Sequence, residues 1–335
     1  MSYEPNVMRR AMARLERRRD RLERERWRLE QELYAREPRL READAGLRKN
    51  MIKLAELAVG GKPVKADGPE IAAIRAENEA LQKKRADLLA GLGYGPDALD
   101  EKPACAACRD TGWVDGKMCS CLKELCAKEQ MAALTALLNL TDGQDFDKLR
   151  LDIYRDWCKA GEGCSPREQM EMVIKTCRGF ARQFPDYPLK NLLLSGGTVL
   201  GKTFLSGCVA REVAGRGFSV VYDTAAGLFA AFDRRRFARD AVESKQARDD
   251  AHRYLACDLL ILDDLGSEFS SPLAQATLYE VVNDRLQSGR NTIISTNLSK
   301  GDIAQRYTPQ VSSRIGGLYQ ELTFYGDDLR FPNAN

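Results

Sequence analysis

A glycine-rich segment that ends in lysine and threonine directly follows the apolar run at residues 192–194. Its eight residues are Gly196, Gly197, Thr198, Val199, Leu200, Gly201, Lys202 and Thr203. In such a segment, backbone N–H groups at a helix N-terminus surround phosphate oxygens. The lysine reaches the β- and γ-phosphates, and the threonine hydroxyl binds Mg²⁺. Because a strand pattern precedes the segment and a helical pattern follows it, a nucleotide site with Mg²⁺ is predicted in preference to an ordinary glycine-rich turn.

Val199 departs from the usual residue type at the fourth position of this loop, which is commonly glycine. The backbone at that position tends toward positive φ, a region that a β-branched side chain resists. Either Val199 is strained or the loop relaxes and loses contacts to phosphate. The sequence therefore predicts weakened nucleotide binding, by roughly tenfold for about 1.4 kcal/mol of strain.

Two further polar segments follow apolar strand patterns. Asp263 and Asp264 end the run at residues 258–264, and Asn297 ends the run at residues 292–297. Asp263 is placed to hold the Mg²⁺ that Thr203 also binds, and Asp264 to orient and polarise an attacking water. Asn297 is expected beside the two acids, although a strand ending in two acids is also an ordinary exit into a loop.

A compact cysteine cluster contains Cys105, Cys108, Cys119 and Cys121. Two close cysteine pairs across a short turn can supply four thiolates to one Zn²⁺, which leaves no open position for water. The cluster therefore predicts a structural zinc site. Two alternatives stay open: Cys126 replaces Cys121 as a ligand, or reduced cysteines are clustered by chance.

The elements that must position these residues alternate between strand and helix patterns from about residue 165 onward. This alternation predicts a doubly wound parallel sheet with its ligand at the carboxyl ends of the strands. Ser165 is expected to cap the first helix, with Glu168 at the third helical position. After the last predicted strand, at residues 320–324, we expect no C-terminal helical lid.

The first 58 residues are predicted to be helical, with Pro38 restarting the helix. Apolar residues recur every seven positions in two phases: Met8, Leu15, Leu22 and Leu29, then Leu33, Leu40, Leu47 and Leu54. One apolar position per heptad is thin for a coiled coil, so a solvated hairpin and a partner-docking surface are equally favoured. The predicted regions are a helical partner-binding region (1–91), a zinc module (92–130), a connector (131–164) and an ATPase domain (165–335).

The composition limits the classes of function. Charged residues make up 30% of the 335 positions, yet the net charge is only +3, so nucleic-acid binding must be local. Arg234, Arg235 and Arg236 form the densest basic run of the predicted ATPase domain. No signal peptide or membrane-spanning run is recognised, and ten cysteines fit reduced thiols, so a cytoplasmic protein without membrane partners is expected.

From about residue 92 onward the sequence resembles bacterial replicative helicase loaders of the DnaC/DnaI type, which are lidless AAA+ ATPases. The resemblance is carried by residues 105–108, 110–113, 119–121, 165–168 and 262–268. It implies ATP hydrolysis, self-association, and loading of a hexameric replicative helicase onto single-stranded DNA. It also implies that Asn297 is a sensor-1 residue, Arg314 an arginine finger and Arg330 a sensor-2 arginine. Val199, and Asp264 in place of the common glutamate, depart from the pattern.

Two other functions remain open from the sequence. A transposition-helper ATPase of the IstB type shares the ATPase core, and an adaptor with a weakened ATPase is compatible with Val199. The cysteine cluster and residues 266–268 favour the loader.

Overall fold

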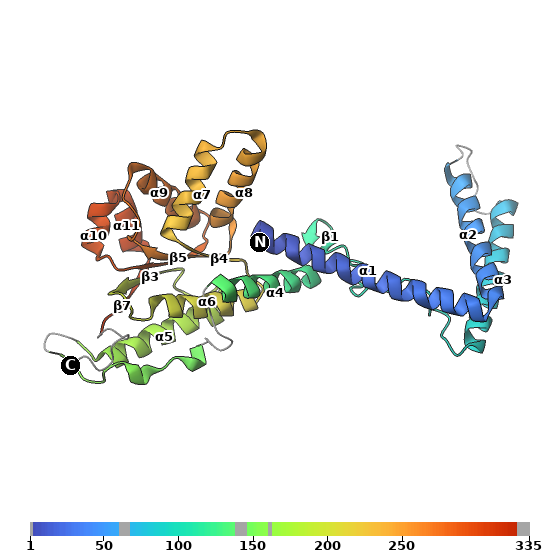
Figure 1. The fold of residues 1–335 in the computed structure, drawn as a ribbon, viewed down its shortest axis with the longest axis horizontal. Helices are drawn as coiled ribbons and strands as arrows, with labels where there is room; N and C mark the ends of the chain where they lie inside the picture. The colour runs from blue at the N-terminus through green and yellow to red at the C-terminus, as the bar shows by residue number, and fades with distance from the viewer. Residues whose placement is uncertain (1–2, 60–67, 138–145, 160–162, 327–335) are drawn as a thin grey trace. The chain divides into compact units, whose positions relative to one another are not determined.

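The structure is a computed structural model that describes residues 3–59, 68–137, 146–159 and 163–326. Its contacts divide the chain into two compact units, one of residues 14–117 and one that joins the first 13 residues to the chain from Met118 onward. Figure 1 labels the elements of both units.

The larger unit is built on a five-stranded sheet in which every neighbouring pair is parallel. The strand order is β4, β5, β6, β3, β7 (Figure 1). The bounds are β3 (Asn191–Gly196), β4 (Val220–Thr224), β5 (Leu259–Leu265), β6 (Asn291–Thr296) and β7 (Gln320–Phe324). Since β3 pairs with both β6 and β7, the phosphate-loop strand lies inside the sheet, and the predicted parallel sheet is confirmed.

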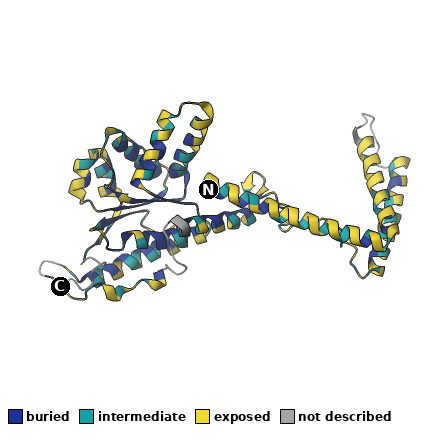
Figure 2. Cartoon of the chain, viewed as in Figure 1, coloured by how far each residue is buried: buried dark blue, intermediate teal, exposed yellow. Residues whose placement is uncertain are grey.

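Helices cover both faces of this sheet because alternate residues of each strand are apolar on opposite faces. On β3, Leu192 and Leu194 pack in one core and Leu193 packs in the other. The first core includes residues of α5 (Pro166–Arg182) and α6 (Lys202–Gly215), together with Leu134 of α4 (Ser120–Leu137). The second includes residues of α7 (Ala225–Phe237), α8 (Ala241–Ala256), α9 (Pro272–Gln287), α10 (Lys300–Arg306) and α11 (Pro309–Leu318). Buried residues concentrate along the sheet between these layers (Figure 2).

Side-chain caps fix where several helices begin. At α5 the Ser165 hydroxyl accepts from the Glu168 N–H, and the Glu168 carboxylate accepts from the Ser165 N–H, as the sequence predicts. Asp240 caps α8 in the same position. Each such cap satisfies backbone N–H groups that have no partner within the helix, which typically stabilises the fold by about 1 kcal/mol.

The first turns of α1 (Pro5–Arg36) belong to the larger unit and pack on α4. Val7 and Ala11 are buried against Leu122 and Cys126. The Tyr3 hydroxyl donates to the carbonyl of Gly217 at 2.5 Å, and burial raises the pKa of Tyr3 well above its usual range. These contacts place the N-terminal turns on elements more than a hundred residues away in sequence.

The smaller unit contains the rest of α1, then α2 (Pro38–Val59), α3 (Pro69–Gly91), β1 (Trp113–Val114) and Lys117 of β2 (Lys117–Met118). Pro38 starts α2 after α1 ends at Arg36, so the predicted restart is confirmed. A small core of Leu33, Leu40, Leu89 and Leu99 joins the helices. Most of α1 and α2 remains exposed (Figure 2), which agrees with the thin apolar stripe of the sequence.

In the described ranges, no helix combines the length and the apolar character needed to cross a bilayer.

Candidate nucleotide site and four-cysteine cluster

The loop between β3 and α6 has three residues in left-handed or similar backbone conformations. Gly196 has φ 143°, Val199 has φ 63° and Gly201 has φ 94°. A Cβ on Gly196 would lie 2.0 Å from the carbonyl oxygen of Phe324, so only glycine fits there. Val199 has the positive φ that the sequence analysis expects of a loop with the usual shape. The Tyr154 hydroxyl also holds the loop, since it donates to the Leu200 carbonyl at 3.1 Å.

The strain at Val199 leads to a prediction for Val199→Gly. A positive φ costs a residue of this type about 1–3 kcal/mol wherever the loop keeps this shape, partly offset by the greater freedom of glycine when unfolded. We therefore expect the free energy of unfolding to rise by about 1 kcal/mol and ATP to bind up to tenfold more tightly. Denaturant unfolding and titration with a fluorescent ATP analogue measure the two effects. Thr198→Gly, with no positive φ to relieve, serves as the control, and no change in either quantity for Val199→Gly would show an unstrained loop.

Lys202 lies at the start of α6 and turns its ammonium group into the loop. Its Nζ donates to the carbonyls of Gly196 at 2.8 Å and Gly197 at 2.5 Å, and to Oδ1 of Asn297 at 2.7 Å. Burial lowers the pKa of Lys202, while the carboxylates of Asp264 and Asp263 act in the opposite direction. The lysine thus lies between the loop and the strand ends, where a cation can contact phosphate oxygens.

Asp263 lies near the C-terminal end of β5 as a buried carboxylate held by two hydroxyl groups. Its Oδ2 accepts from the Tyr222 hydroxyl at 2.7 Å, and its Oδ1 accepts from the Ser295 hydroxyl. Burial and the Asp263 carboxylate raise the pKa of Tyr222. Tyr222 and Ser295 lie on the two strands that flank β5, so the sheet itself orients this carboxylate. Neither hydroxyl is predicted from the sequence.

Asp264 is exposed and has a left-handed backbone with φ 58°. Its N–H donates to the Ser295 hydroxyl at 3.0 Å, and its Oδ1 accepts from Nδ2 of Asn297 at 3.3 Å. Since Asn297 also accepts from Lys202, it links the lysine of the loop to the second acid of β5. The structure therefore brings together Lys202, Asp264 and Asn297, as the sequence predicts.

The donor set at this edge fits a magnesium ion. Carboxylate and hydroxyl oxygens are the ligands that Mg²⁺ prefers, and it usually binds few of them beside substrate phosphates. Thr203 is exposed in the first turn of α6, and Asp263 is oriented by Tyr222 and Ser295. A Mg²⁺ ion held by Thr203 and Asp263 would neutralise charge that develops on the phosphate.

The two arginines implied by the resemblance differ in what the structure shows of them. Arg314 on α11 contacts α9, where its Nε donates to Oδ1 of Asn283 at 3.1 Å and its guanidinium lies 4.9 Å from the ring centre of Tyr279. It is not brought to the cluster of Lys202 and Asp264 of its own chain. Arg330 lies outside the described residues.

The predicted basic run lies in the last turn of α7, and its three arginines differ in whether they contact other residues. Arg235 pairs with Glu280 at 2.8 Å and lies over the Phe232 ring at 4.4 Å. Arg234 and Arg236 are exposed. Only these two side chains are therefore presented to solvent for contact with phosphates.

The predicted metal ligands form one cluster, in which the sulfurs of Cys105, Cys108, Cys119 and Cys121 all lie within 4.8 Å of one another. Four sulfurs at 2.3 Å from a tetrahedral zinc lie about 3.8 Å apart, so the cluster is compatible with zinc. Cys126 is fully buried against the first turns of α1, where burial raises its pKa to about 11. Cys121, and not Cys126, therefore lies with the other three sulfurs, and its role as the fourth zinc ligand stays a prediction.

Backbone geometry near the cluster also suits a metal. The Gly112 N–H donates to the Cys108 sulfur at 3.4 Å. Asp110, with φ 59°, accepts from the N–H groups of Ala104 at 2.7 Å and Cys105 at 3.1 Å, and pairs with Arg18 at 2.7 Å. Such outer contacts orient metal ligands.

We expect purified protein to carry about one zinc per chain and Cys108→Ala to lose it, because three thiolates hold a structural zinc poorly. Metal analysis by mass spectrometry measures the content, and nucleotide titration checks that the larger unit stays folded. Cys257→Ala, a buried cysteine of the larger unit, should keep its zinc. Freshly purified wild type without zinc would contradict the assignment.

The phosphate loop, the acidic end of β5 and the polar tip of β6 define a P-loop nucleotide-binding domain. Residues 184–311, which include all of these, match the sequence profile of a family described as IstB-like ATP binding protein. The matched segment is thus similar to a family of ATP-binding proteins. No curated protein matches the chain.

Three solved structures are each similar to part of this chain. A DnaC helicase loader is 21% identical, with 54% of this chain and 98% of that chain covered and a TM-score of 0.42. DnaI is 20% identical, with 55% of this chain and 95% of the DnaI chain covered and a TM-score of 0.40. DnaA from Aquifex aeolicus, bound to AMPPCP, is 17% identical, with coverage of 49% of each chain and a TM-score of 0.42.

Proposed function

We propose that this chain is an ATP-dependent loader of a ring-shaped replicative helicase, acting on single-stranded DNA in the cytoplasm. The observation that carries the proposal is the convergence of Lys202, Asp264 and Asn297 at one edge of the sheet, inside the segment that matches an ATP-binding family. The four-cysteine cluster and the helical unit that precedes the sheet in the sequence favour a loader over other ATPases with this core.

Each residue of the site has a proposed role in ATP binding and hydrolysis. The loop N–H groups and Lys202 hold the phosphates, and Thr203 and Asp263 hold Mg²⁺. Asp264 polarises the attacking water, and Asn297 positions it against the γ-phosphate. Arg330 is proposed to contact the phosphates from the C-terminal end of the chain.

The proposed partners are a hexameric helicase, single-stranded DNA and further copies of this chain. Arg234 and Arg236 supply local positive charge for DNA phosphates, since the chain as a whole carries only +3.

Binding of purified protein to the host's replicative helicase, compared with binding to a transposase, tests the proposal. Retention of the transposase alone would overturn it.

A transposition-helper ATPase is the second candidate, and the match of residues 184–311 to an IstB-like family favours it. Both candidates hydrolyse ATP, whereas an adaptor with a degenerate ATPase would not. Measured ATP turnover therefore separates the adaptor from the other two.

Self-association leads to a prediction for Arg314. Because the guanidinium of Arg314 contacts Asn283 and Tyr279 of α9, we propose that it reaches the nucleotide of a neighbouring copy. Arg314→Ala should lower turnover by about 10³-fold or more while a single chain still binds ATP. Mixing Arg314→Ala with Asp264→Asn should restore part of the turnover, since one mixed interface contains both intact residues. No recovery in associated mixtures would assign Arg314 a role within its own chain.

A further inference from the structure

A hollow of about 950 Å³ lies in the smaller unit, in the corner between the end of α1 and α2. On α1, Trp27, Glu30 and Tyr34 line it at spacings of three and four residues, so they share one helical face. On α2, Arg41 and Ile52 line it from the facing side. The corner is visible where α2 turns away from the end of α1 (Figure 1).

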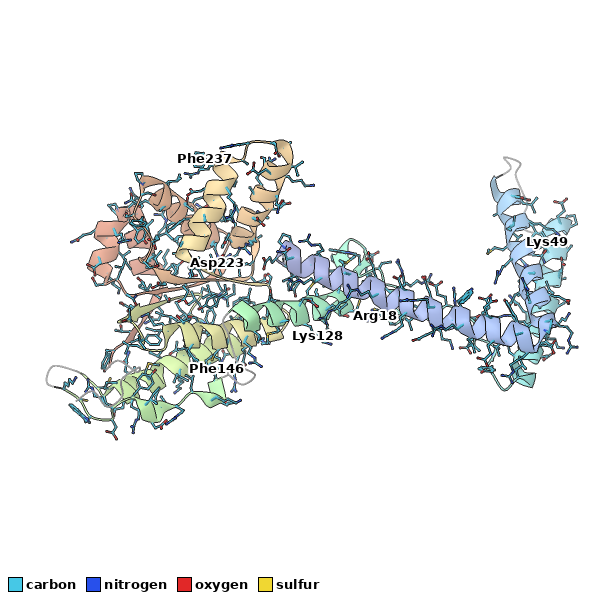
Figure 3. All side chains as sticks on the ribbon, in the orientation of Figure 1. Arg18, Lys49, Lys128, Phe146, Asp223 and Phe237 are labelled. Carbon is cyan, nitrogen blue, oxygen red and sulfur yellow. The ribbon has the colours of Figure 1, made fainter. Side chains whose placement is uncertain are left out.

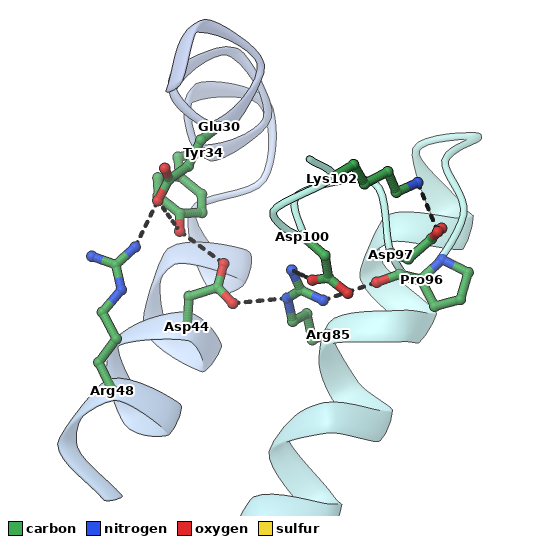
Figure 4. A network of polar contacts seen from close by, with 9 residues as sticks. All are labelled: Glu30, Tyr34, Asp44, Arg48, Arg85, Pro96, Asp97, Asp100 and Lys102. Carbon is green, nitrogen blue, oxygen red and sulfur yellow. Dashed lines mark hydrogen bonds and ion pairs between the residues drawn. The ribbon is translucent and has the colours of Figure 1, made fainter. Parts of the chain in front are cut away.

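A polar network fixes the two walls of this corner (Figure 4). The Tyr34 hydroxyl donates to Glu30 at 2.8 Å and to Asp44 at 2.7 Å, and Arg48 pairs with Glu30 at 2.7 Å. Asp44 is in turn paired with Arg85 of α3 at 2.9 Å. Burial and the two carboxylates raise the pKa of Tyr34. Because these contacts tie all three helices together, the corner is preformed and its walls need little ordering when a ligand binds.

Large apolar side chains stand exposed in the corner. Trp27 is 60% exposed and Ile52 is 56% exposed, and both line the hollow. Exposed apolar groups in a concave surface mark interaction sites, and tryptophan is enriched among the residues that dominate binding energy. Trp27 does not belong to the apolar heptad pattern. Leu33 and Leu40, which do belong to it, are buried in the small core of the unit.

The charges around these apolar groups are predominantly positive. Five lining residues are basic and two are acidic: Arg26, Arg41, Arg48, Lys49 and Lys53, with Glu30 and Glu56. Glu30 is already paired with Arg48, and Lys49 projects from α2 (Figure 3). The corner therefore favours a ligand that is both apolar and acidic.

The size and chemistry of the corner select a helix as that ligand. A helix about 10 Å in diameter occupies roughly 400 Å³ per turn, so the hollow accepts about two turns. Single-stranded nucleic acid is favoured less, because it binds on several exposed stacking aromatics. This corner has two aromatic residues, and only Trp27 is exposed, since Tyr34 is part of the polar network with Glu30 and Asp44. We propose that the corner docks an acidic amphipathic helix of a partner protein. This inference gives the chemistry of a partner in the proposed function. It depends on that function only in one respect, which is that the partner is a protein.

The test uses the full-length protein and a fluorescein-labelled synthetic helix of about five turns. The helix carries leucines at i, i+3, i+4 and i+7 and glutamates on the flanks, and its twin carries lysines instead. We expect saturable binding of the glutamate helix by anisotropy, and at least tenfold weaker binding of the lysine twin. Trp27→Ala and the pair Lys49→Glu, Lys53→Glu should each weaken binding at least tenfold. Trp157→Ala, which removes an exposed tryptophan of the other unit, should leave binding unchanged.

Three results would overturn the proposal: no saturable binding of the glutamate helix, binding insensitive to Trp27→Ala, or equal binding of the lysine twin. Binding of a thymidine oligonucleotide that depends on Trp27, without binding of the helix, would assign the corner to nucleic acid instead. ATP binding is measured in the same variants and should be unchanged. Failure of helix docking with intact ATP turnover thus rejects the corner alone, whereas loss of turnover in wild type rejects the ATPase.

Discussion

Lys202→Ala is expected to abolish measurable ATP binding, with a loss of affinity of roughly 30-fold or more. The ammonium group lies between the loop carbonyls and Asn297, where charge-assisted hydrogen bonds to phosphate oxygens replace those to the protein. Removing one partner of such a buried charged contact costs about 2–5 kcal/mol, which corresponds to roughly 30-fold to several thousandfold in affinity. Titration of a fluorescent ATP analogue measures the loss.

Lys300→Ala is the matched control for this variant. Lys300 is a more exposed cation of the same unit that pairs with Glu321 at 2.7 Å. We expect it to bind ATP like wild type, and both variants to unfold cooperatively in urea. Normal ATP affinity in folded Lys202→Ala would show that nucleotide binds elsewhere.

Asp264→Asn is expected to keep ATP binding and lose about 10²–10⁴-fold in turnover, the range that a general base contributes. The exposed carboxylate stands beside Asn297, which is itself bonded to Lys202, so it faces the position of the γ-phosphate in our proposal. An amide of the same shape keeps the hydrogen bond from Asn297 but accepts no proton. Steady-state phosphate release and nucleotide titration separate the two effects.

Asp223→Asn is the control, because Asp223 lies near the end of the neighbouring strand β4 and contacts Arg253 and Tyr254 of α8. Its turnover should stay within a few-fold of wild type. Equal losses in both variants would point to a general weakening of the strand ends, and full turnover in Asp264→Asn would assign the base to another residue.

Local patterns predict much of the fold and of the candidate site. The sheet follows from apolar runs of strand length, and the start of α5 follows from Ser165 and Glu168. The left-handed Val199 follows from its position in the loop motif. Each of these features depends on neighbouring residues, which is why a single sequence contains them.

Features that depend on distant residues could not be predicted. Tyr222 and Ser295 hold Asp263 only because β4 and β6 flank β5, an order set by packing. The packing of Val7 and Ala11 on α4 likewise joins residues more than a hundred positions apart. Strand order and helix docking arise from the whole core, so pattern alone gave no signal for these contacts.

The central claim is tested most directly by helicase loading onto closed circular single-stranded DNA, which a ring can enter only if it opens. The host's hexameric helicase is mixed with the circle, ATP and this protein, and helicase retained on the DNA is measured after gel filtration. We predict that retention rises with the wild type and ATP, and stays at the background level with Lys202→Ala. Retention that is the same with and without this protein, while its ATPase is active, would contradict the account.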